Sequence, residues 1–219
     1  MKRPRQLAFH RLYGSRLMAD ESGATLVELA VVLPVFLMLF LGLIDFGRMG
    51  AEYVMAEKAI QRAVRVAAVR LPACSANLPQ FNLRGTVPPG TVPPRYGTLC
   101  SAGANTCASP ATVTCAGNIS NTTVAEIWAA TSDLLPQTAT PANLRFTYAY
   151  NSNLGFLGGP YVPVVTVEIQ NLNFQFATPL AGLAALAGAG GSSVPAGTLP
   201  FPTMSNSLPA EDLNLGNNG

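Results

Sequence analysis

Charged residues are scarce in this sequence. Aspartate, glutamate, lysine and arginine make up 11% of its 219 residues, and the formal net charge is +2. Domains that bind nucleic acid normally concentrate basic side chains in a patch or stripe. We therefore expect no nucleic-acid partner. The length accommodates one ordinary domain with an anchor, or at most two small domains.

The chain also lacks side chains that most catalytic sites need. His10 is the only histidine, so neither a Ser/His/Asp nor a Cys/His arrangement can form in residues 45–219. No glycine-rich phosphate-binding motif is present. From residue 71 onward the acids are few and scattered: Glu126, Asp133, Glu168, Glu211 and Asp212. We expect no enzymatic activity, no catalytic residue, no cofactor and no metal site.

The most prominent feature that is present is an apolar run from Ala24 to Ile44, in which Glu28 is the only ionisable side chain. A helix of this length is about 31 Å long, enough to cross a hydrocarbon core of about 30 Å. A charged acid at a bilayer centre costs about 2.5–3.5 kcal/mol on insertion scales, and less near the edge. Glu28 is therefore either an interfacial acid without a partner or an acid with a specific role.

The residues before the apolar run are basic. Residues 1–23 hold five basic side chains against two acidic ones. Cytoplasmic flanks of membrane spans are enriched in lysine and arginine. We therefore expect a cytoplasmic N-terminus and an exported part from residue 45 onward, although Arg48 alone favours the opposite orientation. A secretory signal peptide fits less well, because its apolar region has only about 7–15 residues.

The helical pattern continues past the apolar run. A row of residues recurs at spacings of three and four: Met49, Tyr53, Ala56, Ile60, Ala63 and Ala67. No proline occurs between Pro34 and Pro72, so we expect one helix over residues 24–70, about 70 Å long. The row packs either on the protein's own small domain or on other subunits, and both can hold along so long a helix.

Residues 71–121 are rich in proline and contain all the cysteines: Cys74, Cys100, Cys107 and Cys115. We expect an irregular loop region that disulfides hold together. An even number of cysteines fits an oxidising compartment, and four cysteines allow three pairings that the sequence does not distinguish. Zinc is the alternative, but the gaps of 25, 6 and 7 residues between the cysteines contain no close C-x-x-C pair of the kind found in structural zinc sites.

Residues 122–206 predict a small α+β domain. Thr123 and Glu126 have the spacing of a capping box, and the helix that they begin ends by Pro136. Aromatic side chains then alternate with others over residues 144–150, which predicts a strand.

Two further runs alternate between apolar and polar residues, at 165–169 and 172–176. The apolar residues have odd numbers in the first run and even numbers in the second. We therefore expect an antiparallel hairpin with a β-bulge near Gln170 and Asn171. A weaker strand is expected near 197–205 and a flexible tail over 207–219. The predicted fold is therefore α+β, with a transmembrane helix that continues into a long helix, a second helix and an antiparallel sheet of about three strands.

The start of the apolar run resembles a known family. The matching residues are Glu21-Ser22-Gly23-Ala24-Thr25-Leu26-Val27-Glu28-Leu29-Ala30, then Val32-Leu33-Pro34, then Leu41-Gly42-Leu43-Ile44-Asp45-Phe46-Gly47-Arg48. This set resembles the type IV prepilin class and, more specifically, the TadE-like pseudopilins of tight-adherence (Tad) pilus assembly. The resemblance covers about residues 21–70.

The resemblance implies processing. A prepilin peptidase would cut after Gly23, making Ala24 the N-terminal residue and Glu28 the fifth residue of the mature chain. The new α-amino group would need a counter-charge in apolar surroundings, and the Glu28 carboxylate, in the same or a neighbouring subunit, would supply it. Classical type IV pilins favour phenylalanine where this chain has Ala24.

The resemblance also implies a function. It suggests a minor pilin or pseudopilin that assists assembly of a tight-adherence pilus, with its C-terminal domain in the periplasm. The expected partners are the prepilin peptidase, other pilins, inner-membrane assembly proteins and membrane lipid. The alternative is an unprocessed single-pass protein of the bacterial inner membrane that serves as a periplasmic binding or scaffold module.

Overall fold

The computed structural model describes residues 22–74, 78–178, 198–211 and 213. Over these residues the fold is α+β, with one long N-terminal helix, a second short helix and antiparallel sheets, as the sequence predicts. The chain divides into two compact units: Met1–Gly47 with Phe176–Thr198, and Arg48–Gln175 with Leu199–Gly219.

The long helix, α2, extends over Ser22–Val69 and contains Pro34. Its apolar part is long and apolar enough to cross a membrane, and none of the most apolar stretch is buried. Large side chains such as Leu26, Leu39 and Leu43 are about two-thirds exposed or more. A helix that is apolar on all sides requires either lipid or other helices around it.

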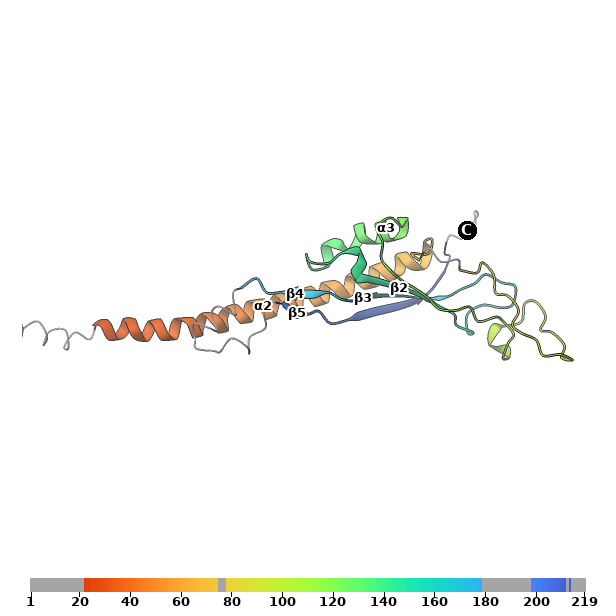
Figure 1. The fold of residues 1–219 in the computed structure, drawn as a ribbon, viewed down its shortest axis with the longest axis horizontal. Helices are drawn as coiled ribbons and strands as arrows, with labels where there is room; N and C mark the ends of the chain where they lie inside the picture. Colours follow the sequence, from red (N-terminus) through yellow and green to blue (C-terminus); the bar gives the residue numbers. More distant parts are fainter. Residues whose placement is uncertain (1–21, 75–77, 179–197, 212, 214–219) are drawn as a thin grey trace, which may run out of the picture. The chain divides into compact units, whose positions relative to one another are not determined.

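The C-terminal part of α2 has one buried face. Ala56, Ile60, Ala63 and Ala67 of the predicted row are at most 2% exposed, whereas Tyr53 is 37% exposed. From Ala56 onward the row therefore packs on the protein's own domain. Small side chains here allow close approach, and Figure 1 shows this part of α2 running along the sheet with α3 beside it.

A four-stranded antiparallel sheet forms the other side of this core. Its strands are β1 (Val113–Ala116), β2 (Leu144–Ala149), β3 (Val164–Ile169) and β6 (Met204–Pro209), in the order β1-β2-β3-β6. Alternate side chains of β2 and β3 are buried, among them Phe146, Tyr148 and Val167 at 0% exposure. This alternation follows from the two-residue period of a strand.

The sheet differs from the prediction in two places. β1 lies within the region expected to be irregular loop, and β6 extends to Pro209, into the expected flexible tail over 207–219. Neither strand shows a strong apolar alternation in sequence, because both lie at the edges of the sheet. Backbone pairing with β2 and β3, respectively, orders them instead.

The predicted hairpin between residues 165–169 and 172–176 is wrong. β3 pairs with β2 and β6, whereas β4 (Asn173–Gln175) pairs with β5 (Thr198–Pro200) in a separate two-stranded sheet. Between β3 and β4, Asn171 has a φ of 53°, a left-handed conformation that asparagine tolerates better than most residues. The change in parity therefore marks a turn of the chain from one sheet to another.

The second helix, α3, extends over Thr122–Thr131. Its N-cap is Asn121, whose side chain accepts hydrogen bonds from the backbone N–H groups of Thr123 and Val124, so the predicted capping box is wrong. The Thr123 hydroxyl instead donates to the Leu71 carbonyl. Short 3-10 turns occur at Cys100–Ala102, Ser132–Leu134 and Pro141–Asn143.

Polar contacts join α3 to the C-terminal part of α2 and to the two residues that follow it. Arg70 forms a bidentate ion pair with Glu126 at 3.0 Å, which raises the pKa of the arginine. Arg62 donates to the Ala130 carbonyl at 3.1 Å. Together with the Thr123–Leu71 hydrogen bond, these contacts hold α3 along the end of α2.

The four cysteines form two disulfides, Cys74–Cys115 and Cys100–Cys107. The first joins the segment after α2 to β1, and the second closes a short loop. Close by, the Ala73 backbone N–H donates to the buried Tyr148 hydroxyl at 2.8 Å. Burial raises the pKa of Tyr148, and this hydrogen bond opposes the increase.

Candidate functional site

The residues expected to be processed lie at the beginning of α2. Gly23 and Ala24 belong to its first turn, and residues 1–21 of the expected basic leader are outside the described residues. Cleavage after Gly23 therefore stays a prediction.

The Glu28 carboxylate is exposed on the apolar part of α2. Within the described part of the chain it has no hydrogen-bond or ion-pair partner. The structure therefore places this acid one turn from Ala24, with its oxygens available to a group outside the described residues.

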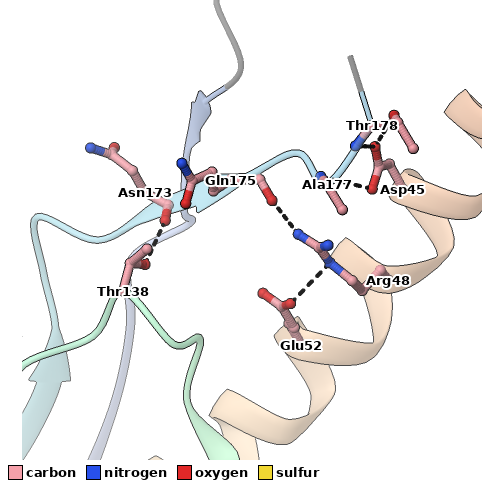
Figure 2. A network of polar contacts seen from close by, with 8 residues as sticks. All are labelled: Asp45, Arg48, Glu52, Thr138, Asn173, Gln175, Ala177 and Thr178. Carbon is pink, nitrogen blue, oxygen red and sulfur yellow. Dashed lines mark hydrogen bonds and ion pairs between the residues drawn. The ribbon is translucent and has the colours of Figure 1, made fainter. Parts of the chain in front are cut away.

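At the other end of the apolar run, Asp45 is 1% exposed. Its carboxylate accepts hydrogen bonds from the backbone N–H groups of Ala177 at 3.2 Å and Thr178 at 3.1 Å, and from the Thr178 hydroxyl (Figure 2). Beside it the Phe46 ring meets the Phe176 ring edge to face, with centroids 6.0 Å apart. These contacts, which we call the Asp45 cluster, hold residues 176–178 on α2.

The second compact unit contains its own polar cluster, around Arg48. The guanidinium donates to the Gln175 carbonyl and forms an ion pair with Glu52 at 3.2 Å (Figure 2). It also lies 4.8 Å from the centre of the Phe174 ring. An arginine can make all three contacts at once because its planar head offers several donors and stacks on aromatic rings. This Arg48 cluster holds β4 on α2.

Sequence reasoning missed the role of both residues. Asp45 and Arg48 were recognised only as part of a family motif, and Arg48 as a weak topological signal. The available signal was their position, since an acid and a base directly after an apolar run are costly unless partners satisfy them. Apart from Glu52, which lies one helical turn after Arg48, the partners named above are more than 120 residues away in sequence, so the sequence does not identify them.

The cysteine positions agree with the expectation of disulfides. Of the three possible pairings the structure has Cys74 with Cys115 and Cys100 with Cys107, with Cα atoms 5.6 Å and 5.1 Å apart. Among the described residues no group of three or more histidine, cysteine, aspartate or glutamate side chains is arranged to hold a metal ion.

Comparison with known families finds one match for part of the chain: residues 23–68 match the family described as TadE-like protein. The match begins at Gly23 and ends one residue before the last residue of α2. Comparisons with curated proteins and with solved structures find no match. The α+β domain after α2 is therefore described by its own structure alone.

Proposed function

Because the chain carries a TadE-like segment at residues 23–68, we propose that it is a minor pilin or pseudopilin that assists assembly of a tight-adherence pilus at the bacterial inner membrane. It acts through helix packing and protein–protein contacts and presents its α+β domain in the periplasm. The observation that carries the proposal is the start of the family match at Gly23, five residues before the single acid of the apolar run.

The exposed apolar surface of α2 supports this role. Side chains on all sides of residues 25–44 are accessible, including Val31, Phe36 and Phe40. A surface of this kind is stable when lipid or other apolar helices cover it. Before assembly the cover is the bilayer; in an assembled pilus it is the equivalent helices of other subunits.

Glu28 determines the depth at which each helix packs. After cleavage, the α-amino group of Ala24 is a positive charge in apolar surroundings, where ions without a counter-charge are costly. The Glu28 carboxylate has no partner in the described part of the chain and lies one helical turn away. It pairs with this amino group, within one subunit or between neighbours, and so fixes the depth of each helix.

The orientation follows from the charges and the cysteines. The five basic residues before Gly23 keep the leader in the cytoplasm, where the prepilin peptidase acts. Both disulfides then lie in the oxidising periplasm.

The direct test is the mass of the mature protein. Protein extracted from membranes of a host with an active prepilin peptidase should begin at Ala24, and Gly23→Val should leave the leader attached. If the wild-type protein keeps Met1 to Gly23, it is an unprocessed anchored module and the pseudopilin mechanism is wrong.

The test of assembly is Glu28→Ala. We expect normal membrane insertion and a pilus count at least about tenfold lower, since a buried charge without its partner costs several kcal/mol. Glu57→Ala, which removes an exposed acid of α2 beyond the apolar run, is the control and should leave piliation unchanged. Normal piliation of Glu28→Ala would refute the counter-charge role.

A further inference from the structure

A cleft lies beside the Cys100–Cys107 disulfide, outside the TadE-like segment. Its volume is about 550 Å³, and its lining includes Arg84, Thr86, Ser101, Asn105, Tyr150 and Ser152. Clefts of about 300–1,000 Å³ with a few polar groups are typical of small-molecule sites. The cleft belongs wholly to the second compact unit.

The walls of this cleft are held in place before any ligand binds. The disulfide closes the loop over residues 100–107, and the Ala108 backbone N–H donates to the Leu83 carbonyl at 2.7 Å. At Gly85 the two walls touch so closely that a Cβ atom would lie 2.2 Å from the Asn105 carbonyl oxygen. A preformed wall lowers the ordering cost of binding.

Among the described residues that line the cleft, Arg84 is the only charged one. Its guanidinium lies 5.1 Å from the centre of the Tyr96 ring, and that ring packs on Gly158, where a Cβ atom would meet it at 2.6 Å. Arg48, Arg70 and Arg145 each pair with a glutamate, but Arg84 has no ion-pair partner in the described part of the chain. It is therefore positioned by an aromatic ring with its charge not neutralised.

The two segments that line the cleft, residues 84–109 and 150–152, carry charge of one sign. Residues 71–125 contain two charged side chains, Arg84 and Arg95, and no acid. An anion is thus attracted to this region, and the guanidinium can bind a carboxylate through two hydrogen bonds.

The remaining lining is suited to hydroxyl groups. Thr86, Ser101, Ser109 and Ser152 contribute hydroxyls, and Asn105 contributes an amide. Tyr150 adds a ring that stacks on Tyr161, with centroids 6.5 Å apart and planes 4° apart. Burial raises the pKa of Tyr150, whose phenol group can donate or accept a hydrogen bond.

We propose that this cleft binds a sugar that carries one carboxylate, a uronic acid, with Arg84 on the carboxylate and the hydroxyl and amide groups on the sugar hydroxyls. A simple anion would use only the arginine, and a neutral sugar would leave it without a counter-charge. The site is independent of leader processing and gives the exported domain a ligand of its own.

The test is titration calorimetry of the full-length chain in detergent micelles with three probes: sodium D-glucuronate, D-glucose and sodium acetate. We expect glucuronate to bind at least about tenfold more tightly than either of the others. Arg84→Gln should weaken glucuronate binding about tenfold to a hundredfold, since hydrogen bonds to charged groups contribute about 1.5–3 kcal/mol.

Arg95→Gln is the matched control, because it removes the other positive charge of the region without changing the lining; it should keep binding within about twofold of wild type. Equal binding of glucose and glucuronate, or of acetate and glucuronate, would overturn the proposal. Unchanged glucuronate binding in Arg84→Gln would also overturn the proposal. Protection of the β2 and β3 amides from hydrogen exchange checks that this variant is folded. Failure here leaves the proposed pilin function untouched, because that function is tested by mass and piliation.

Discussion

Asp45 illustrates how a costly residue is accommodated at the end of an apolar helix. A carboxylate that is 1% exposed needs hydrogen bonds to all its oxygens, and the backbone of residues 177–178 with the Thr178 hydroxyl supplies them. The Asp45 carboxylate thus holds a segment that lies more than 130 residues later in the chain.

Replacing this acid tests that role. Asp45→Asn keeps the shape but removes the charge and one acceptor, so we expect a loss of about 1.5–3 kcal/mol for the contact. Hydrogen exchange of the Ala177 and Thr178 amides should become at least about tenfold faster, while exchange in β2 stays unchanged. Equal protection in the variant and the wild type would show that the carboxylate does not hold this segment.

At the scale of elements, α2 combines two kinds of helix in one continuous stretch. Residues 25–44 are apolar on all sides, whereas from Ala56 onward one face is buried and the other carries exposed polar side chains such as Glu57 and Gln61. The first part needs a partner from outside the described chain, and the second part already has one in the domain core.

The buried face of α2 tolerates little extra volume. Ala63 is 1% exposed, so Ala63→Leu should lower the free energy of unfolding by about 1–3 kcal/mol through overpacking. Denaturant unfolding of the detergent-solubilised chain measures this. Gln61→Leu adds a leucine to the exposed face of the same helix and should change stability by less than about 0.5 kcal/mol. Similar losses for both variants would contradict the assignment of the buried face.

At the scale of the whole molecule, the two disulfides stabilise the proline-rich region of the chain, where they take the role that apolar packing has elsewhere. Cys74–Cys115 closes a loop with a sequence separation of 41, while Cys100–Cys107 closes one of 7. The long loop joins the end of α2 to the edge strand β1, so it connects the helix to the sheet.

The two disulfides should therefore differ in their effect on stability. In the chain-entropy account, removing Cys74–Cys115 costs about 4 kcal/mol and removing Cys100–Cys107 about 2.5 kcal/mol. Unfolding curves of the double variants Cys74→Ser/Cys115→Ser and Cys100→Ser/Cys107→Ser test this order. A larger loss from the short loop would show that native contacts around it, rather than loop length, determine the result.

Much of the fold is encoded locally. The apolar run, the length of α2 and the alternation in β2 and β3 all depend on neighbours within a few residues, and each was predictable. The edge strands β1 and β6 were not, because pairing with a neighbour rather than their own side-chain pattern creates them. The partners of β3 and β4 were mispredicted for the same reason.

The features of the candidate site likewise fall into two groups, those that the sequence determines and those that only the tertiary structure determines. The sequence by itself determined a helix long and apolar enough to cross a membrane, the position of Glu28 five residues after Gly23 and the presence of a disulfide-bonded loop region, because charge, hydropathy and spacing are properties of the linear chain. Only the tertiary structure decided which cysteines pair, what satisfies Asp45 and Arg48, and that Arg84 lines a cleft without an ion-pair partner among the described residues. These depend on groups brought together from distant parts of the chain, and folding alone determines which of them meet.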